Sequence, residues 1–301
     1  MMSPTINAAR LSGVHVALAT PIGADGEIDV EALARLAGRV IDGGVDGLCP
    51  TGSTGEGPRL TRSQRLAVLR CVRDCAGPER MIIPAVCALA PVEVRDEVAG
   101  LAEAGASGVL VAPPFYYPMA PGDQLAWYEA VAADSAVPLV LYNIPAMTGV
   151  SIAPDVVASL ARHDRIVGIK DSSRDMEYLQ RVARETSGTD FAVLTGTDTL
   201  LMAALQVGAN GAIAASMNLV PRLARTVYDA FLRHDLPTAT AAQHQLVDIV
   251  EACRVGMAPA GWKAALAWAG VCSAHMVPPF TELDTGSTAA LSATLERLMP
   301  T

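Results

Sequence analysis

Lys170 is the residue whose type and position most directly suggest chemistry. It is one of two lysines in a chain of 301 residues, because arginine supplies the remaining positive side-chain charge. It ends the apolar run 166–170 and is followed by Asp171, so the run predicts a buried strand with an amine at its carboxyl end. Burial disfavours the ammonium form, and a neutral lysine amine is the nucleophile of Schiff-base chemistry. The alternative is a strand-end lysine that only extends to solvent.

The segment Thr51–Gly57, with the sequence T-G-S-T-G-E-G, has the composition of an anion-binding loop. Its glycines allow close backbone approach, and successive N–H groups can surround a negative charge. It lacks the Gly-Lys-Ser/Thr ending of a nucleotide-binding loop, so a carboxylate is favoured over a triphosphate. The loop as a whole, which includes Gly52, is therefore expected to bind substrate. A tight turn capped by its own hydroxyls is the alternative.

Two tyrosines could assist an amine. Tyr142 closes the apolar run 138–143, and a phenol near Lys170 could relay protons during imine formation. The alternative for Tyr142 is a core ring whose hydroxyl only makes a structural hydrogen bond. Tyr116 lies in a proline-bounded aromatic loop that could also serve subunit contacts. The second lysine, Lys263, falls on a predicted helix and is interpreted as structural.

Short apolar runs alternate with amphipathic segments along the chain. This alternation predicts the strands and helices that position the candidate residues. The predicted strands are 14–20, 46–50, 81–86, 108–112, 138–143, 166–170, 191–195 and 211–215. The predicted helices between them are 29–43, 61–76, 91–105, 121–134, 153–162, 175–186, 198–207 and 221–233. Strand–helix repetition predicts a parallel sheet with right-handed crossovers, and eight units close a barrel. An open doubly wound sheet is the alternative, but no G-x-G-x-x-G follows the first strand.

After residue 236 the strand pattern stops, and three further helices are predicted at 237–255, 259–270 and 287–299. The expected fold is α/β, a (β/α)8 TIM barrel over residues 1–235 with a C-terminal helical domain over 236–301. Active sites of such barrels lie at the carboxyl ends of the strands. The polar loop after the second strand, Tyr142 and Lys170 all fall there.

Composition excludes several classes of function. The net charge of −9 argues against a nucleic-acid partner, which needs a basic surface. No apolar stretch is long enough to span a bilayer, and the first ten residues lack the pattern of a signal peptide. Six scattered cysteines without a second zinc-like pair favour reduced thiols, so a cytoplasmic location is expected.

Four motifs in order carry a resemblance that extends over nearly the whole chain. They are G-S-T-G-E at 52–56, P-F-Y-Y-P at 114–118, Y-N-I-P-A-M-T-G at 142–149 and G-I-K-D-S-S at 168–173. Together they resemble the dihydrodipicolinate synthase and N-acetylneuraminate lyase superfamily of class I aldolases. The resemblance implies a homotetramer built as a dimer of dimers, with no metal or organic cofactor.

The resemblance also implies residue roles. Lys170 would form an imine with pyruvate or another 2-oxo acid, and an aldehyde would be the second small molecule. Tyr142 would relay protons, linked to Thr54 and to Tyr116 of a neighbouring subunit. The positions implied to hold the carboxylate or line the imine pocket are Ser53, Thr54, Gly196 and Ile213.

The aldehyde end of the pocket distinguishes family members. Dihydrodipicolinate synthases carry an arginine where this chain has Met147, so a cation for a second carboxylate is expected to be absent. Asp198 resembles a sugar-binding aspartate of neuraminate lyases, but Thr199 and Ala215 depart from their pattern. The preferred interpretation is an aldolase for 2-keto-3-deoxy sugar acids, with hydroxyl-binding positions Thr197, Asp198 and Thr199.

Other interpretations stay open at this point. Dihydrodipicolinate synthase, N-acetylneuraminate lyase, and a dehydratase or deaminase would use the same imine. A barrel that binds a 2-oxo acid without turning it over is a different class. It would have no need of a lysine with a proton relay. A metal-dependent aldolase would need a His, Asp and Glu ligand set at the strand ends, which the sequence does not show.

Overall fold

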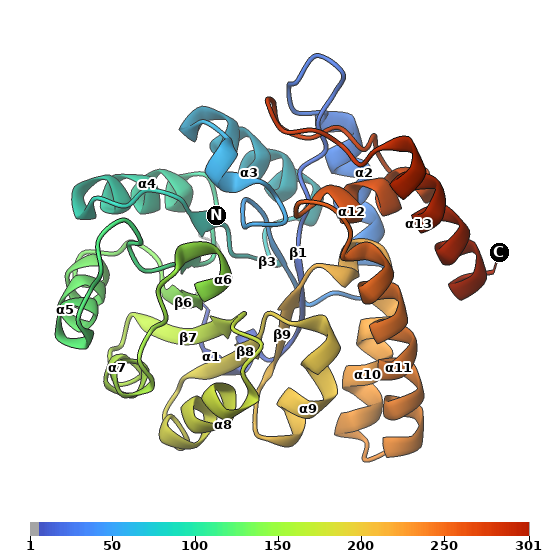
Figure 1. Cartoon of the computed structure of the whole chain (residues 1–301). Coiled ribbons are helices and arrows are strands. Elements are labelled where there is room, and N and C mark those ends of the chain that lie inside the picture. Colours follow the sequence, from blue (N-terminus) through green and yellow to red (C-terminus); the bar gives the residue numbers. More distant parts are fainter. Residues whose placement is uncertain (1–5, 301) are drawn as a thin grey trace.

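The structure is a computed structural model that describes residues 6–300, and it shows a ring of parallel strands surrounded by helices (Figure 1). The neighbouring strands follow the order β3-β2-β1-β9-β8-β7-β6-β5-β4, and every pairing is parallel. The strands are β1 (Gly13–Ala17), β2 (Gly47–Cys49), β3 (Met81–Ile82), β4 (Ala85–Val86), β5 (Val109–Val111), β6 (Leu139–Asn143), β7 (Ile166–Asp171), β8 (Ala192–Thr195) and β9 (Gly211–Ala214).

Strands β3 and β4 are the two halves of the single strand predicted at 81–86. Pro84 interrupts it, because proline has no N–H to donate to a neighbouring strand. The segment still forms backbone hydrogen bonds with the neighbouring chain segments on both sides. The N–H of Ala85 donates to the carbonyl of Pro50 at 3.1 Å, and the N–H of Leu110 donates to the carbonyl of Pro84 at 2.8 Å. The sheet therefore closes through this segment, and the predicted eight-stranded (β/α)8 TIM barrel is confirmed.

The predicted outer helices are present with ends shifted by a few residues. They are α2 (Val30–Asp42), α3 (Arg62–Ala76), α4 (Pro91–Glu103), α5 (Pro121–Ala132), α7 (Pro154–Leu160), α8 (Met176–Glu185), α9 (Leu201–Gln206) and α10 (Pro221–Leu232). Side chains of Asp29, Thr61 and Asp175 accept hydrogen bonds from the first turns of α2, α3 and α8. These contacts satisfy backbone N–H groups that would otherwise lack a partner at the start of each helix.

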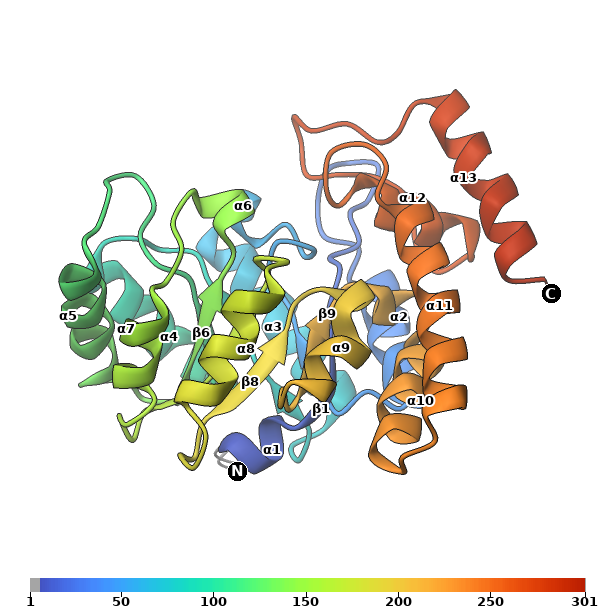
Figure 2. The same cartoon turned by 60° about the horizontal axis from the view of Figure 1, so that its bottom comes forward.

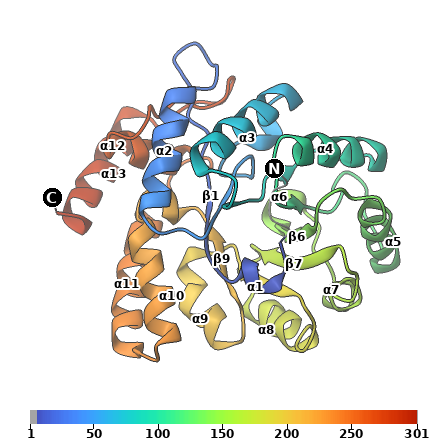
Figure 3. The same cartoon turned by 180° about the vertical axis from the view of Figure 1, so that it is seen from behind.

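Two short helices were not predicted from the sequence. Helix α1 (Ala8–Leu11) crosses the end of the barrel opposite the carboxyl ends of the strands, as Figure 3 shows from behind. Its Leu11 is fully buried in the barrel interior. Helix α6 (Pro145–Thr148) follows β6 directly. Four-residue helices carry too little periodicity to be recognised in a sequence.

The three predicted C-terminal helices are α11 (Leu236–Cys253), α12 (Ala260–Trp268) and α13 (Thr285–Leu298). Helix α11 packs along α10, and α13 contacts both α11 and α12 (Figure 2). Apolar residues of α11, such as Leu246 and Ile249, belong to the same buried cluster as the outer faces of the strands. The division into domains at residue 235 stays a prediction.

The barrel has two apolar layers because successive strand residues point to opposite faces. In β6, Leu139 and Leu141 pack outward against the helices, whereas Val140 and Tyr142 point into the barrel. The inward direction at the end of β6 is thus fixed by strand alternation. Within residues 6–300, no helix is both long and apolar enough to cross a membrane.

Candidate active site

Lys170 and Tyr142 form the centre of the site. They are partners in the pairing of β7 with β6, so the sheet register sets them side by side at the carboxyl ends of their strands. The Nζ of Lys170 lies 4.3 Å from the centroid of the Tyr142 ring. Lys170 is only 4% exposed. A buried amine thus lies against a phenol at the end of the barrel where catalysis occurs in this fold.

Ser53 connects the loop after β2 to this pair. Its Oγ lies 3.3 Å from the hydroxyl oxygen of Tyr142, and either group can donate the hydrogen bond. Thr54 lines the same cavity. The resemblance implied a link from Tyr142 to Thr54, but in this single chain the hydrogen bond of Tyr142 goes to Ser53. We call Lys170, Tyr142 and Ser53 the floor of the cavity.

The loop after β2 is held in a conformation suited to binding an anion. Thr51 has φ of 58° and Glu56 has φ of 53°, both in the left-handed region that non-glycine residues rarely adopt. A Cβ on Gly57 would lie 1.7 Å from the carbonyl oxygen of Thr51, so this position requires glycine. Among residues 6–300, the backbone N–H groups of Ser53 and Thr54 have no hydrogen-bond acceptor. Both can therefore donate to a bound carboxylate.

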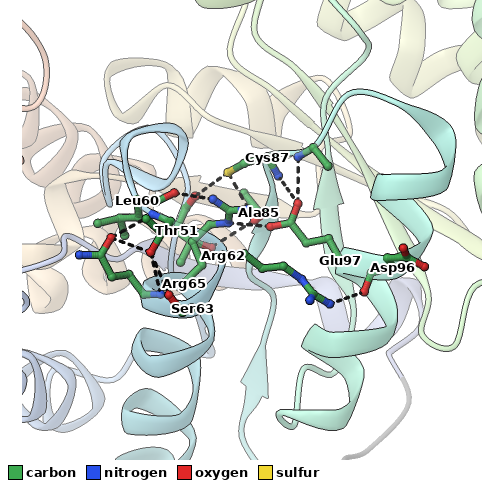
Figure 4. A network of polar contacts seen from close by, with 12 residues as sticks. Thr51, Leu60, Arg62, Ser63, Arg65, Ala85, Cys87, Asp96 and Glu97 are labelled. Carbon is green, nitrogen blue, oxygen red and sulfur yellow. Dashed lines mark hydrogen bonds and ion pairs between the residues drawn. The ribbon is translucent and has the colours of Figure 1, made fainter.

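A polar network fixes the base of this loop (Figure 4). Arg65 donates from Nε to Glu97 at 2.6 Å and from a terminal nitrogen to the carbonyl of Leu60 at 2.6 Å. Glu97 also accepts the backbone N–H of Cys87 at 3.0 Å. The hydroxyl of Thr51 donates to the carbonyl of Ala85 at 3.2 Å. These contacts join the loop after β2 to the segment after β4, and so stabilise the position of Ser53.

The ends of β6 and β7 are joined by a buried amide and carboxylate. The side-chain nitrogen of Asn143 donates to Asp171 at 2.7 Å, and the hydroxyl of Ser173 donates to the other oxygen of Asp171 at 2.9 Å. Burial raises the pKa of Asp171 above its ordinary value, and these hydrogen bonds oppose the shift. The pair holds the residues next to Tyr142 and Lys170 in register.

A cavity of about 400 Å³ opens above the floor. Most of the predicted site residues line it, including all that were expected to bind the keto acid except Gly52. These are Ser53, Thr54, Tyr142, Met147, Lys170, Gly196, Thr197, Asp198 and Ile213. Residues that sequence reasoning did not select complete its outer wall, and they come from the end of α11 and the loop that leads into α12.

Three predicted site residues lie elsewhere. Gly52 lines a second cavity, of about 410 Å³, which shares Ser53 and Tyr142 with the first. Thr199 does not line the main cavity. Tyr116 is 78% exposed and packs edge to face against Tyr117, so within one chain it does not reach Tyr142. Its expected action from a neighbouring subunit stays a prediction.

Gly196 is required by the crowding around Lys170. A Cβ at this position would lie 1.9 Å from the Oγ of Ser172 and 3.1 Å from the Cε of Lys170. The bare backbone at Gly196 leaves space for the lysine side chain. Gly196 thus leaves room for Lys170 in the cavity, and its role beside an imine stays a prediction.

Asp198 lies in the wall and is buried. Its carboxylate accepts the backbone N–H of Ser216 at 2.9 Å. Burial raises its pKa above the ordinary value, and the hydrogen bonds from Ser216 and the charge of Arg254 oppose that shift. A carboxyl group that is more easily protonated can act as donor or acceptor toward a substrate hydroxyl.

Two arginines in the wall were missed by the sequence reasoning. Arg174 follows β7, and Arg254 ends α11, and both line the main cavity. Met147 supplies no cation at its own position, but two cations line the cavity from other elements. Arg174 could have been noticed four residues after Lys170, whereas Arg254 carries no local signal. We call Met147, Arg174 and Arg254 the rim of the cavity.

The second lysine lies outside the cavity, as expected. Lys263 is fully buried, and its Nζ lies 2.5 Å from Glu56 and donates to the carbonyl of His275 at 2.6 Å. Burial lowers the pKa of Lys263 below its ordinary value, and the charge of Glu56 opposes that change. Glu56 also pairs with Arg59 at 2.8 Å. The network connects the loop after β2 to the C-terminal helices.

Comparisons with known proteins agree with this geometry. The model of the dihydrodipicolinate synthetase family matches residues 10–298. The chain is 36% identical to a 4-hydroxy-tetrahydrodipicolinate synthase of Streptomyces coelicolor, over 92% of this chain and 90% of the relative. It is 35% identical to an uncharacterised DapA-like lyase of Halobacterium salinarum, over 96% and 94% of the two chains.

A solved structure gives the same result. A prophage protein of E. coli K12 from the dihydrodipicolinic acid synthase family, determined in complex with pyruvate, superimposes with a TM-score of 0.91 at 30% identity. The alignment covers 96% of this chain and 98% of the other. The chain therefore belongs to the dihydrodipicolinate synthetase family, whose members are lyases and aldolases of the class I Schiff-base type.

Proposed function

We propose that this family member cleaves or forms a carbon–carbon bond with pyruvate through an imine on Lys170, and that its substrate is a 2-keto-3-deoxy sugar acid. The observation that carries the proposal is the buried amine of Lys170, 4.3 Å from the Tyr142 ring, in a cavity that Ser53 and Thr54 of the loop after β2 also line. No metal or organic cofactor is invoked, because a protonated imine is itself an electron sink.

In the cleavage direction, the Nζ of Lys170 attacks the C2 carbonyl of the sugar acid, and loss of water gives a protonated imine. A base removes the proton of the C4 hydroxyl, and the C3–C4 bond breaks. Its electrons pass through C3 to the imine nitrogen, which leaves an enamine and an aldehyde. Protonation of C3 and hydrolysis release pyruvate and regenerate the amine. Tyr142 relays protons in these steps, with Ser53 as its hydrogen-bond partner.

The wall of the cavity supports a hydroxylated substrate. Thr197 and Asp198 line it and offer a hydroxyl and a carboxyl group. Met147 replaces the arginine expected of a dihydrodipicolinate synthase, and it also lines the cavity. These groups suit the hydroxyls of a sugar acid chain better than they suit one fixed second carboxylate at the position of Met147.

Borohydride trapping tests the imine. The protein is incubated with pyruvate, reduced with borohydride and digested, and the adduct is located by mass spectrometry. We expect the adduct on Lys170. An adduct on Lys263, or on no lysine, would contradict the mechanism.

The alternatives are separated by turnover with a panel of aldehydes. Glyceraldehyde reports aldol chemistry on sugar acids, N-acetylmannosamine reports neuraminate lyase activity, and aspartate semialdehyde reports synthase activity. Synthase activity is the second candidate because a relative with that name is 36% identical. Trapping without turnover of any aldehyde would indicate a barrel that only binds 2-oxo acids. The metal-dependent alternative has no ligand set, because no group of three or more suitable side chains gathers within residues 6–300.

We also propose that the protein works as a homotetramer in the cytoplasm. Tyr116 and Tyr117 are 78% and 75% exposed, and a subunit contact would cover them. Mass measurement in solution by light scattering tests the assembly. A monomer with full activity would contradict the expected contribution of Tyr116 to a neighbouring site.

A further inference from the structure

We propose that Arg174 and Arg254 form an anion-binding subsite at the rim, which selects substrates whose aldehyde half ends in a carboxylate or a phosphate. The inference rests on the proposed imine chemistry of Lys170 and extends it to the substrate class. It changes the expected substrate from a neutral-ended sugar acid to one with an acidic group at both ends.

Arg174 lies in the turn between β7 and α8, four residues beyond Lys170. Its φ of 64° is in the left-handed region, where an arginine costs more than a glycine or asparagine. Within residues 6–300, its side chain makes no hydrogen bond and no ion pair. A long cation in a strained turn at the cavity thus has no structural partner that would explain it.

Arg254 lines the same cavity from a different element, as the residue that ends α11. Its only side-chain hydrogen bond among the described residues is to the hydroxyl of Thr199, at 3.4 Å. Burial and the charge of Arg174 lower the pKa of Arg254, while Asp198 and Glu251 oppose this change. Both guanidinium-bearing residues line one cavity, and within residues 6–300 neither has an acidic group in ion-pair contact.

Several other arginines of the chain form ion pairs. Arg59 contacts Glu56 at 2.8 Å, Arg65 contacts Glu97 at 2.6 Å, and Arg225 contacts Asp46 at 2.9 Å. Two cations that line one cavity without an ion-pair partner repel each other, and a bound anion would relieve that repulsion. The guanidinium group is also the side chain best suited to bidentate binding of carboxylate and phosphate.

The position of the pair relative to Lys170 defines the ligand. Lys170 lies on the floor and is 4% exposed, whereas both arginines are exposed residues at the rim of the same cavity. A substrate attached to Lys170 through C2 has its first carboxylate at the loop of Ser53 and Thr54. The remainder of its chain extends toward the rim. A terminal anion there would meet the two guanidinium groups.

Imine trapping with two acids of equal chain length tests the subsite. The protein is titrated with 2-oxoadipate, which ends in a carboxylate, and with 2-oxohexanoate, which ends in a methyl group, and the borohydride adduct on Lys170 is quantified. We expect 2-oxoadipate to reach half-saturation at a concentration about tenfold lower, as one charged hydrogen bond provides. Arg174→Gly and Arg254→Gln should each remove most of that difference.

The variants are chosen so that folding does not decide the result. Arg174→Gly relieves a left-handed backbone, and Arg254→Gln keeps a polar helix end. Arg233→Gln is the matched control, because Arg233 is an exposed residue that ends α10 and lies away from the cavity. It should leave the titrations of both acids unchanged. Pyruvate trapping should also be unchanged in Arg233→Gln.

The outcomes separate this inference from the proposed function. Half-saturation at the same concentration for both acids would overturn the subsite alone. So would arginine variants that raise the half-saturation concentrations of both acids equally. The absence of any adduct would overturn the imine chemistry and the inference with it. Comparing tartronate semialdehyde, glyceraldehyde 3-phosphate and glyceraldehyde as acceptors then distinguishes a carboxylate from a phosphate. Equal kcat/KM for all three would contradict the subsite.

Discussion

The floor and the rim of the cavity are built in different ways. The floor residues Lys170 and Tyr142 are partners in a strand pair, so backbone hydrogen bonds of the sheet fix their relative position. The rim residues Met147, Arg174 and Arg254 belong to a short helix, a turn and a helix end. No sheet register joins them.

This difference separates chemistry from selectivity. Imine formation needs an amine and a proton relay held within a few ångströms, and the barrel supplies that rigidity. Recognition of the aldehyde depends on side chains from loops, which can change without disturbing the strands. The floor therefore indicates the reaction class that the family shares, and the rim indicates the substrate selectivity of this particular chain.

The largest expected effect is at the floor. Lys170→Ala removes the amine that forms the imine, so we expect turnover to fall by at least about a thousandfold, because no other group can supply the electron sink. Aldol cleavage and adduct mass are the measurements. Retention of the adduct in this variant would show that a different lysine reacts. Circular dichroism serves as the control for folding.

Tyr142→Phe tests whether the phenol acts in chemistry or only in packing. Loss of a proton relay should lower kcat by about a hundredfold to ten-thousandfold. The stability cost should stay near 1 kcal/mol, because only the hydrogen bond with Ser53 is lost. Tyr128→Phe is the matched control, since Tyr128 is fully buried, lies away from the cavity, and donates to the carbonyl of Val111 at 3.1 Å. It should lose stability and keep activity. Equal losses of activity and stability in Tyr142→Phe would make it a core residue.

The sequence was sufficient to predict the floor and the barrel. Alternating apolar and amphipathic segments gave the strand count, and strand ends gave Lys170 and Tyr142, because the barrel must place strand ends together. Pro84 in the third strand was visible in the sequence, but its consequence was not predicted. A proline removes one donor, yet its carbonyl still accepts from Leu110, so the barrel closes around the interruption.

The buried ion pair between Lys263 and Glu56 links the floor to the C-terminal helices. Both side chains are fully buried, so Lys263→Met would remove the buried partner of Glu56 and leave it only the partly exposed Arg59. We expect a loss of about 3–5 kcal/mol in unfolding free energy, measured by chemical denaturation. The double variant Glu56→Gln with Lys263→Met should recover part of the loss. On the surface, Arg181→Gln breaks an exposed pair with Glu185 and should change stability little. A small effect of Lys263→Met would show that the pair is not what holds the loop of Ser53.

The rim could not be predicted to the same extent. Arg254 is far from Lys170 in the sequence, and only the packing of α11 beside the barrel brings it to the cavity. Thr199 was selected by its neighbourhood in sequence, yet it contacts Arg254 and does not line the cavity. Side-chain direction at a turn or a helix end depends on tertiary contacts, which a periodic pattern does not contain.

Gly196→Ala tests the packing that lies between floor and rim. The new methyl group would approach the Oγ of Ser172 to 1.9 Å and the Cε of Lys170 to 3.1 Å. Overpacking of this kind costs about 1–3 kcal/mol, and displacement of Lys170 should also lower kcat. Adding Ser172→Gly removes the closest contact and should restore stability more than activity, because the contact with Lys170 stays. Full recovery of both would show that Lys170 is not displaced. Thermal unfolding and aldol cleavage are the measurements.

The smallest expected effect concerns Asp198, which connects the wall to Ser216. Its pKa is raised in the folded protein by burial, so the folded state retains a proton that the unfolded state has already lost. The stabilisation is therefore complete below the ordinary pKa of 3.8 and is lost as pH rises through the folded value. Relative to Asp198→Asn, the wild type should lose stability with rising pH in that window, by at most about 1.4 kcal/mol per pH unit. Urea denaturation at several pH values measures this.

Asp284 should change stability with pH in the opposite direction to Asp198, and the same denaturation experiment measures it. Hydrogen bonds from Ser287 lower the pKa of Asp284, so its contribution to stability is lost as pH falls, and Asp284→Asn should remove that trend. The buried carboxyl of the cavity wall and the exposed one at the start of α13 should therefore give pH profiles with slopes of opposite sign. A difference between wild type and Asp198→Asn that does not vary with pH would mean that burial does not shift Asp198.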